Sequence, residues 1–122
     1  MTTAVPTIAV FPEERLTQSQ KIEKWVWQLC RSLEQNYEHR YPNSSVPVTF
    51  SMESGRKYWK INQNHGGVHA FVDKKTGEVY KPASYNAPAK HVRFDMRIIN
   101  QREQLHNPFF TGWAGGYLYL RG

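Results

Sequence analysis

The chain has 122 residues, a formal net charge of +6 and a single cysteine, Cys30. A chain of this length is expected to form one domain over residues 1–122 and to bury roughly two-thirds of its unfolded surface. One cysteine excludes an intrachain disulfide framework and a multi-cysteine zinc site, and no stretch approaches the ~20 apolar residues of a membrane span.

The first predicted element is an extended arm at residues 1–16. It contains two prolines and no clear periodicity. The alternative is an edge strand over residues 7–11, because a proline on either side is tolerated at the edge of a sheet.

A long amphipathic helix is predicted over residues 17–38. Thr17 and Gln20 have the spacing of a capping box at its start. The apolar residues recur every three or four positions and form one stripe, which predicts that the helix packs on a sheet. Trp27 lies off this stripe, so its ring either makes an exposed contact or lies along the helix flank. The stripe consists of Ile22, Trp25, Val26, Leu29, Cys30, Leu33 and Tyr37.

An antiparallel meander is predicted over residues 48–81. Asp73 can open the last turn by accepting a bond from its own backbone, and Gly77 can close that turn with a positive φ. Short links between successive apolar runs favour antiparallel pairing. The expected strands cover residues 48–52, 56–62, 68–73 and 78–81.

Residues 82–122 are predicted to be an irregular, aromatic C-terminal segment. Within it, residues 91–97 are a possible short strand, and residues 98–105 a helical turn or two. Tyr117 to Leu120 is expected to return to the sheet as a last strand. The fold class is therefore α+β, with one long helix on a small antiparallel sheet of three to five strands.

The positive charge is concentrated in one part of the chain. Residues 56–97 carry nine Lys and Arg against three Asp and Glu, a net +6, whereas residues 1–55 carry five against six. Concentrated basicity favours an anionic partner, such as nucleic acid, an acidic protein or a membrane surface. A solvated surface without a partner is the alternative.

Strict alternation along the strands predicts two different sheet faces. One face is apolar and meets the helix: Trp59, Ile61, Val68, Ala70, Val72 and Val79. The other face mixes rings and cations, the combination with which proteins bind single-stranded nucleic acid. Alternatively, the C-terminal aromatics at positions 109, 110, 113 and 117 cover this face. The candidate binding residues are Lys57, Tyr58, Lys60, His69, Phe71, Tyr80, Lys81, Lys90, Arg93 and Arg97.

No catalytic or metal-binding motif is evident. His65 and His69 would lie roughly 13 Å apart along a strand, too far to share a metal ion. The alternative is a turn at Gly66 and Gly67 that shortens this distance. Asp95 near His91 is typical of an ion pair rather than of an acid–base pair. The sequence has no glycine-rich phosphate loop in a strand–loop–helix context. We therefore expect a protein that is not an enzyme and that has no cofactor and no bound metal.

The block VHAFVDKKTGEVYKPASYNAPAKHVRFDM at residues 68–96 resembles short, mostly uncharacterised proteins of tailed bacteriophages, particularly cyanophages. The Trp-Ala-Gly-Gly-Tyr-Leu-Tyr run at residues 113–119 is similar to the same group, whereas the helix is not covered. This resemblance implies a host-takeover factor, an accessory of DNA metabolism or a virion component. It supplies no catalytic residue.

Together these features predict a non-enzymatic phage accessory protein. We expect it to bind nucleic acid, or an acidic host or phage protein of a nucleic-acid machine, through the basic sheet region. The alternative is a minor virion protein that contacts its neighbours through the arm and the aromatic C-terminus. Its expected location is the cytoplasm of an infected bacterial host, or the virion, and no membrane association is expected.

Overall fold

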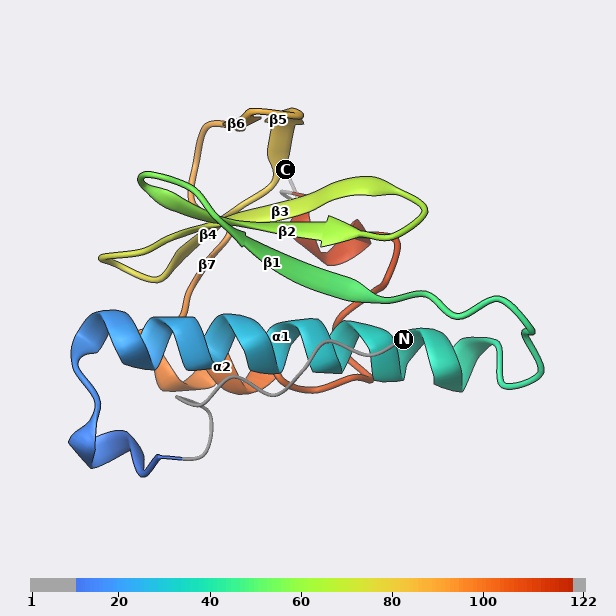
Figure 1. Ribbon diagram of the computed structural model, residues 1–122, viewed down its shortest axis with the longest axis horizontal. Helices are drawn as coiled ribbons and strands as arrows, with labels where there is room; N and C mark the ends of the chain where they lie inside the picture. The colour runs from blue at the N-terminus through green and yellow to red at the C-terminus, as the bar shows by residue number, and fades with distance from the viewer. Residues whose placement is uncertain (1–10, 120–122) are drawn as a thin grey trace.

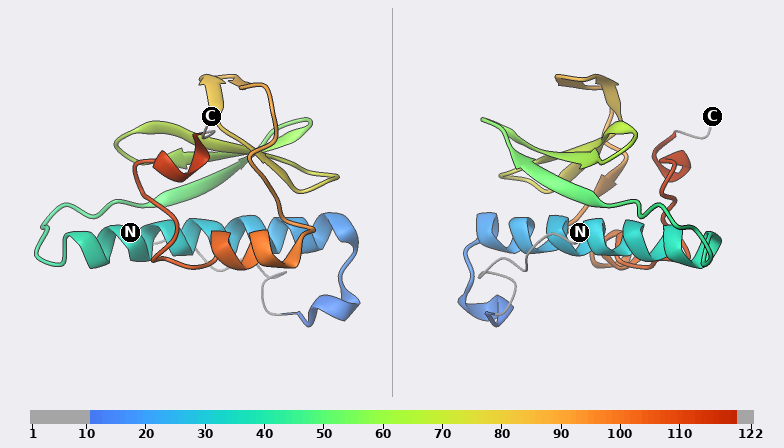
Figure 2. Two further views of the ribbon diagram at one scale, coloured as in Figure 1. Left: turned by 180° about the vertical axis from the view of Figure 1, so that it is seen from behind. Right: turned by 45° about the vertical axis from the view of Figure 1, so that its right-hand side comes forward.

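The computed structural model describes residues 11–119 and has an α+β fold (Figure 1). Helices α1 (Gln18–Arg40) and α2 (Ile99–Leu105) lie side by side beneath a five-stranded antiparallel sheet. A second sheet of two strands rises from the opposite side (Figure 2). The predicted fold class is confirmed. The strands are β1 Phe50–Ser54, β2 Tyr58–Gln63, β3 Gly67–Asp73, β4 Glu78–Tyr80, β5 Pro82–Ser84, β6 Ala87–Pro88 and β7 Phe94–Asp95.

The long helix begins where its capping box predicts. Thr17 Oγ1 accepts from the Gln20 backbone N–H at 3.2 Å, and Gln20 Oε1 accepts from the Thr17 N–H at 2.9 Å. The apolar stripe from Ile22 to Leu33 is buried against the sheet. Trp27 is half-buried and its ring packs beside Arg31 at 5.5 Å, so it lies along the helix flank.

The core lies between α1 and the sheet. Leu29 is fully buried in one cluster with Ile61 and Val72, as the stripe predicts. Parts of the chain with weaker sequence signals complete this cluster. Met96 precedes α2, Leu105 ends it, and Leu118 comes from the C-terminal segment. The core is closed by Phe50, Val79, Met96, Leu105 and Leu118.

The main sheet has the order β1-β2-β3-β4-β7, with antiparallel pairing throughout. In the β3–β4 turn, Asp73 Oδ1 accepts from the backbone N–H groups of Lys75 at 2.8 Å and Thr76 at 3.0 Å. Gly77 has a φ of 76°. Both turn predictions are confirmed.

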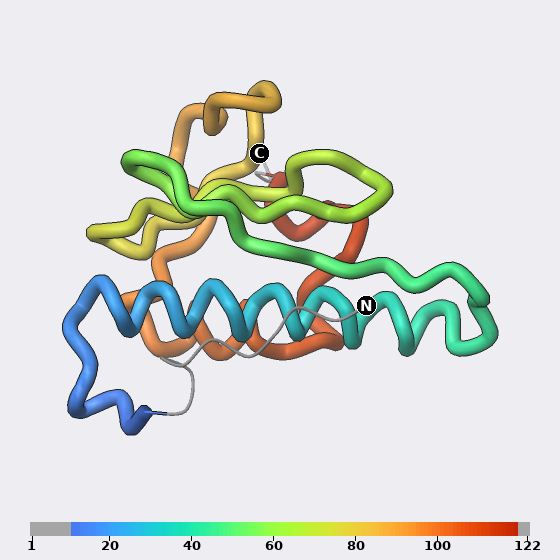
Figure 3. The backbone as a smooth tube through the Cα atoms, viewed as in Figure 1, coloured from blue at the N-terminus to red at the C-terminus, as the bar shows by residue number. Residues whose placement is uncertain are grey.

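The first two strands begin two residues later than expected. Figure 3 shows the connection that carries the chain from α1 back over the helix to β1.

A β-bulge in β3 overturns part of the predicted face assignment. Ile61 pairs with Ala70, but its neighbour Asn62 pairs with Val68, which leaves His69 as the extra residue. A bulge shifts the alternation by one position. Val68 therefore faces away from the helices with Asn62, and His69 turns toward the core, opposite to the prediction for both residues.

The C-terminal third is more ordered than predicted. Strands β5 and β6 form a hairpin where an irregular connection was expected. Strand β7 lies within the short strand considered for residues 91–97, and α2 lies within the helical turns expected at residues 98–105. Tyr117 and Leu118 lie in a 3-10 helix, η3 (Gly116–Leu118), so the predicted last strand is wrong. Gly115, with a φ of 87°, turns the chain and Leu118 enters the core.

The predicted N-terminal arm is tested only at its end. The 3-10 helix η2 (Glu13–Arg15) stands where an extended chain was expected. The alternative edge strand falls almost entirely outside the described residues.

Candidate nucleic-acid interface

Four of the predicted site residues share the outer face of the main sheet, the face opposite the helices. Lys60 pairs with Phe71, and Phe71 pairs with Tyr80 on the next strand. The Tyr58 ring lies 5.9 Å from the rings of both Phe71 and Tyr80. The structure thus brings together rings and a cation from β2, β3 and β4.

The centre of this aromatic cluster is closed to solvent. Phe71 is only 3% exposed, because hairpin β5–β6 lies against β3. Lys60 Nζ lies 6.0 Å from the centre of the Phe71 ring. The C-terminal aromatics pack elsewhere: Trp113 lies on Tyr37 and Phe109 on His39, both of α1. Phe110 and Tyr117 lie on Phe94, which pairs with the core residue Val79. Phe71 therefore offers no free ring to a base, which corrects its proposed stacking role.

The outer face also carries carboxylates, whose position the net charge of residues 56–97 does not show. Tyr58 pairs with Asp73, and Glu78 pairs with Asp95. Burial and the neighbouring Glu78 carboxylate, which accepts a bond from the Tyr80 hydroxyl, raise the pKa of Tyr80. Carboxylates therefore lie beside the rings at the end of the face near the β3–β4 turn.

Both arginines of the predicted site are engaged within the fold. Arg93 Nε donates to the Leu118 carbonyl at 2.7 Å, and its Nη1 donates to the Lys90 carbonyl at 2.7 Å. Arg97 forms a two-pronged pair with Asp95, at 3.1 and 2.8 Å. This pair also lowers the pKa of the Asp95 carboxyl. Arg93 is therefore used within the fold, whereas a phosphate would have to compete with Asp95 for the exposed Arg97. The phosphate role of both arginines stays a prediction.

His69 is a core residue. Its ring packs edge-on against Phe50 at 5.2 Å, and its Nε2 lies 2.8 Å from the Tyr117 hydroxyl. Burial lowers the pKa of His69 from 6.5 to about 4. The imidazole is therefore neutral at pH 7 and carries no charge for a phosphate, because the β-bulge turned it inward.

Two exposed tyrosines that sequence reasoning missed lie beside predicted lysines. Tyr85, at the tip of hairpin β5–β6, is 63% exposed and its ring centre is 4.1 Å from Lys60 Nζ. Tyr119 is 62% exposed and lies 4.9 Å from Lys81 Nζ. We call these contacts the two lysine–tyrosine pairs. The sequence signal that could have located this hairpin is the pair of prolines Pro82 and Pro88, which pair across it.

A hollow of about 360 Å³ lies beside the second pair. It is bordered by the β2–β3 turn, the start of β5 and the C-terminal segment, and Lys81 and Tyr119 both line it. Gly67 has a φ of 80° there, and a Cβ at this position would meet no atom within 4 Å. Pockets that hold small ligands start at about 300 Å³, so the hollow is large enough for one nucleobase.

The remaining predicted cations, Lys57 and Lys90, are exposed, with Lys57 Nζ 5.4 Å from the Tyr58 ring. Within residues 11–119, no group of three or more His, Cys, Asp or Glu side chains is placed to hold a metal ion. The same part of the chain contains no helix with the length and hydrophobicity needed to cross a membrane.

Comparison with known families gives one match, to the model of a family of unknown function, DUF7717, over residues 9–120. The chain belongs to DUF7717. The match spans both helices, both sheets and the lysine–tyrosine pairs, so the DUF7717 region includes the whole fold described above. No curated protein and no solved structure matches the chain.

Proposed function

We propose that this protein is a non-enzymatic accessory protein that binds single-stranded nucleic acid at the two lysine–tyrosine pairs. The observation that carries the proposal is the exposure of Tyr85 and Tyr119, each held beside a lysine. An exposed ring stacks on a base of any sequence, and a cation beside it meets the adjoining phosphate.

The geometry favours a single strand over a duplex. The rings stand at the tip and at the base of hairpin β5–β6 rather than on a helix or ribbon that enters a groove. Bases in a duplex are stacked on one another and are closed to such rings, whereas unpaired bases are free. The hollow beside Lys81 gives one base a place to insert.

The resemblance of residues 68–96 to tailed-phage proteins supports a role in an infected bacterial host. The hairpin and Lys81 fall inside this block. The proposed location is therefore the host cytoplasm, where nucleic acid in single-stranded form is exposed during replication and transcription.

A binding screen tests this function. Fluorescence anisotropy at about 50 mM salt, where electrostatic contacts are strong, compares labelled 20-nucleotide single-stranded DNA, single-stranded RNA and duplex DNA. We expect one of the single strands to bind at least tenfold more tightly than the duplex. Equal affinity for all three would contradict base stacking, and no binding to any of them would exclude the function.

A minor virion protein is the second candidate, because neighbouring aromatic rings of the C-terminal segment are exposed. Phe109 is 78% exposed and lies 4.9 Å from the His39 ring, and the adjoining Phe110 is 39% exposed. Contiguous exposed apolar side chains favour a contact with another protein. Native mass spectrometry separates the candidates: an assembled state without oligonucleotide supports the virion role, and a monomer or dimer that gains an oligonucleotide supports the first.

A further inference from the structure

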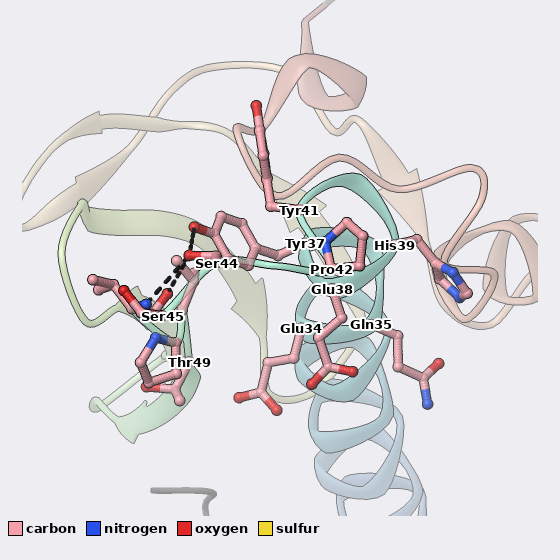
Figure 4. A pocket seen from close by; sticks show the side chains of 13 residues that line it. Glu34, Gln35, Tyr37, Glu38, His39, Tyr41, Pro42, Ser44, Ser45 and Thr49 are labelled. Carbon is pink, nitrogen blue, oxygen red and sulfur yellow. Dashed lines mark hydrogen bonds between the residues drawn. The ribbon is translucent and has the colours of Figure 1, made fainter.

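A separate groove lies away from hairpin β5–β6, at the C-terminal end of α1. It has a volume of about 910 Å³ and separates the last two turns of α1 from residues 42–49 (Figure 4). The Tyr37 hydroxyl bonds to Ser44 Oγ at 3.2 Å, and Ser44 Oγ bonds in turn to the Val46 carbonyl at 3.1 Å. These bonds tie the outer wall of the groove to the helix.

The charged side chains that line this groove are acidic. Glu34 and Glu38 project from α1 toward the same side, as their spacing of four residues requires (Figure 4). No lysine or arginine is among the described residues that line it. This is notable in a chain of net charge +6, and it makes the groove unsuited to phosphate.

The two carboxylates differ in what they already bind. Glu34 Oε2 accepts from the Phe50 backbone N–H at 2.8 Å and from Arg31 Nη2 at 3.0 Å, so it is a structural group. Glu38 is exposed and forms no hydrogen bond or ion pair with any of residues 11–119. Its carboxylate is therefore available to a ligand.

Aromatic and proline side chains complete the lining. The rings of Tyr37 and Tyr41 lie 5.1 Å apart, and Tyr41 is exposed. Pro42 and Pro47 lie along the groove with the exposed Val46. Grooves lined by aromatic rings bind extended, proline-containing peptides, which lose little conformational entropy on binding. A guanidinium pairs with a carboxylate through two hydrogen bonds and also stacks on a tyrosine ring.

We propose that this groove binds an extended segment of a partner protein that contains proline and arginine. An arginine of the segment pairs with Glu38, and its prolines lie on the rings of Tyr37 and Tyr41. Charge complementarity carries this assignment, since Glu38 offers a carboxylate that has no partner among residues 11–119 and no lysine or arginine among the described residues lines the groove. The site is separate from the nucleic-acid interface and does not depend on it.

An NMR titration tests the proposal with two synthetic probes. One is a ten-residue peptide of alternating prolines and arginines, and the other has glutamate in place of each arginine. The arginine peptide should shift the backbone amide signals of residues 34–49 and leave those of residues 82–88 unchanged. The variant Glu38→Gln should bind it at least fivefold more weakly, and Tyr41→Ala should weaken it further.

The matched control is Glu103→Gln, which removes the same charge from an exposed position on α2 and should leave the affinity unchanged. Equal binding of the glutamate peptide, or full affinity in Glu38→Gln, overturns the proposal. Sedimentation of the protein alone gives a further check. Self-association that Glu38→Gln abolishes would show that a second copy occupies the groove, and this too overturns the assignment to a partner.

Discussion

His69 Nε2 lies 2.8 Å from the Tyr117 hydroxyl, and this contact joins the bulge of β3 to the C-terminal 3-10 helix. The imidazole is buried between Phe50 and Tyr117, and burial lowers its pKa from 6.5 to about 4. In the unfolded chain the same ring takes up a proton near its ordinary pKa. Between these two pKa values the unfolded state therefore binds more protons than the folded state.

This difference predicts a loss of stability in acid. The contribution of His69 is complete above pH 6.5 and falls as the pH drops toward about 4. Between pH 7 and pH 5 it should lower the free energy of unfolding by on the order of 1–2 kcal/mol. Urea unfolding of the parent and of His69→Gln at pH 7 and pH 5 measures this change in the free energy of unfolding. Because burial also lowers the pKa of His106, the decisive quantity is the difference between the two proteins. An identical pH dependence in both would contradict the buried neutral imidazole.

The core prediction concerns Leu29. Its side chain is fully buried in the cluster that joins α1 to β2 and β3. Leu29→Ala should lower the free energy of unfolding by about 2–5 kcal/mol, because it removes buried methyl groups and leaves a cavity. Chemical denaturation gives the value. A loss below about 1 kcal/mol would mean that the helix stripe does not pack on the sheet as described.

The turn prediction concerns Gly77. Its φ of 76° is strained for any residue with a side chain, and an added Cβ would lie 3.2 Å from Met96 Cβ. Gly77→Val should therefore destabilise the protein by about 1 kcal/mol or more. Gly112→Ala is the control, since a Cβ there meets nothing within 4 Å. Thermal unfolding should separate the two variants clearly, and equal melting temperatures would be inconsistent with the turn geometry.

The two arginines near β7 should behave differently on removal. Arg93 donates to the Leu118 and Lys90 carbonyls and so fastens the C-terminal segment to β7. Arg93→Ala should cost about 1–3 kcal/mol, because charged hydrogen bonds to partly buried carbonyls are lost. Arg97→Ala removes an exposed ion pair with Asp95 and should change stability little. The reverse order in denaturation experiments would show that Arg93 is free for other partners.

The parts of the fold that the sequence predicted depend on local signals. The helix followed from the capping box at Thr17 and the apolar stripe, and the β3–β4 turn followed from Asp73 and Gly77. The bulge at His69 was missed, because it arises from the pairing of β2 with β3 and the sequence of neither strand indicates it. The 3-10 helix at Tyr117 was missed for a similar reason: its aromatic residues are as typical of a strand as of a turn that inserts Leu118 into the core.

The candidate site was predictable only in part. The sequence placed Tyr58, Lys60 and Tyr80 on one face, because strand alternation holds through β2 and β4. It could not show that hairpin β5–β6 covers Phe71, because this is a tertiary contact and neither segment carries a local sequence signal for it. The exposure of Tyr85 depends on the same hairpin. A count of charges along the chain also could not reveal that Arg93 and Arg97 are used within the fold.

In the proposed complex, the two lysine–tyrosine pairs bind single-stranded nucleic acid: the lysines contact phosphates and the tyrosines stack on bases. Lys60→Ala with Lys81→Ala should flatten the slope of log affinity against log salt by about 1.4 units, because each phosphate contact in a single strand contributes about 0.7. Tyr85→Ala with Tyr119→Ala should weaken binding by about 1–3 kcal/mol for each stacked base and leave the slope unchanged. The control is Arg15→Ala with Arg40→Ala, which removes two exposed cations at the ends of the helical layer.

The most direct test is the salt titration of these three double variants against the single strand that the parent binds best. We expect the plot of log affinity against log salt to have a flatter slope only for the lysine variant. Only the tyrosine variant should give a line parallel to that of the parent at lower affinity. A parent slope retained in the lysine variant, or a control variant that flattens it as much, would contradict the account.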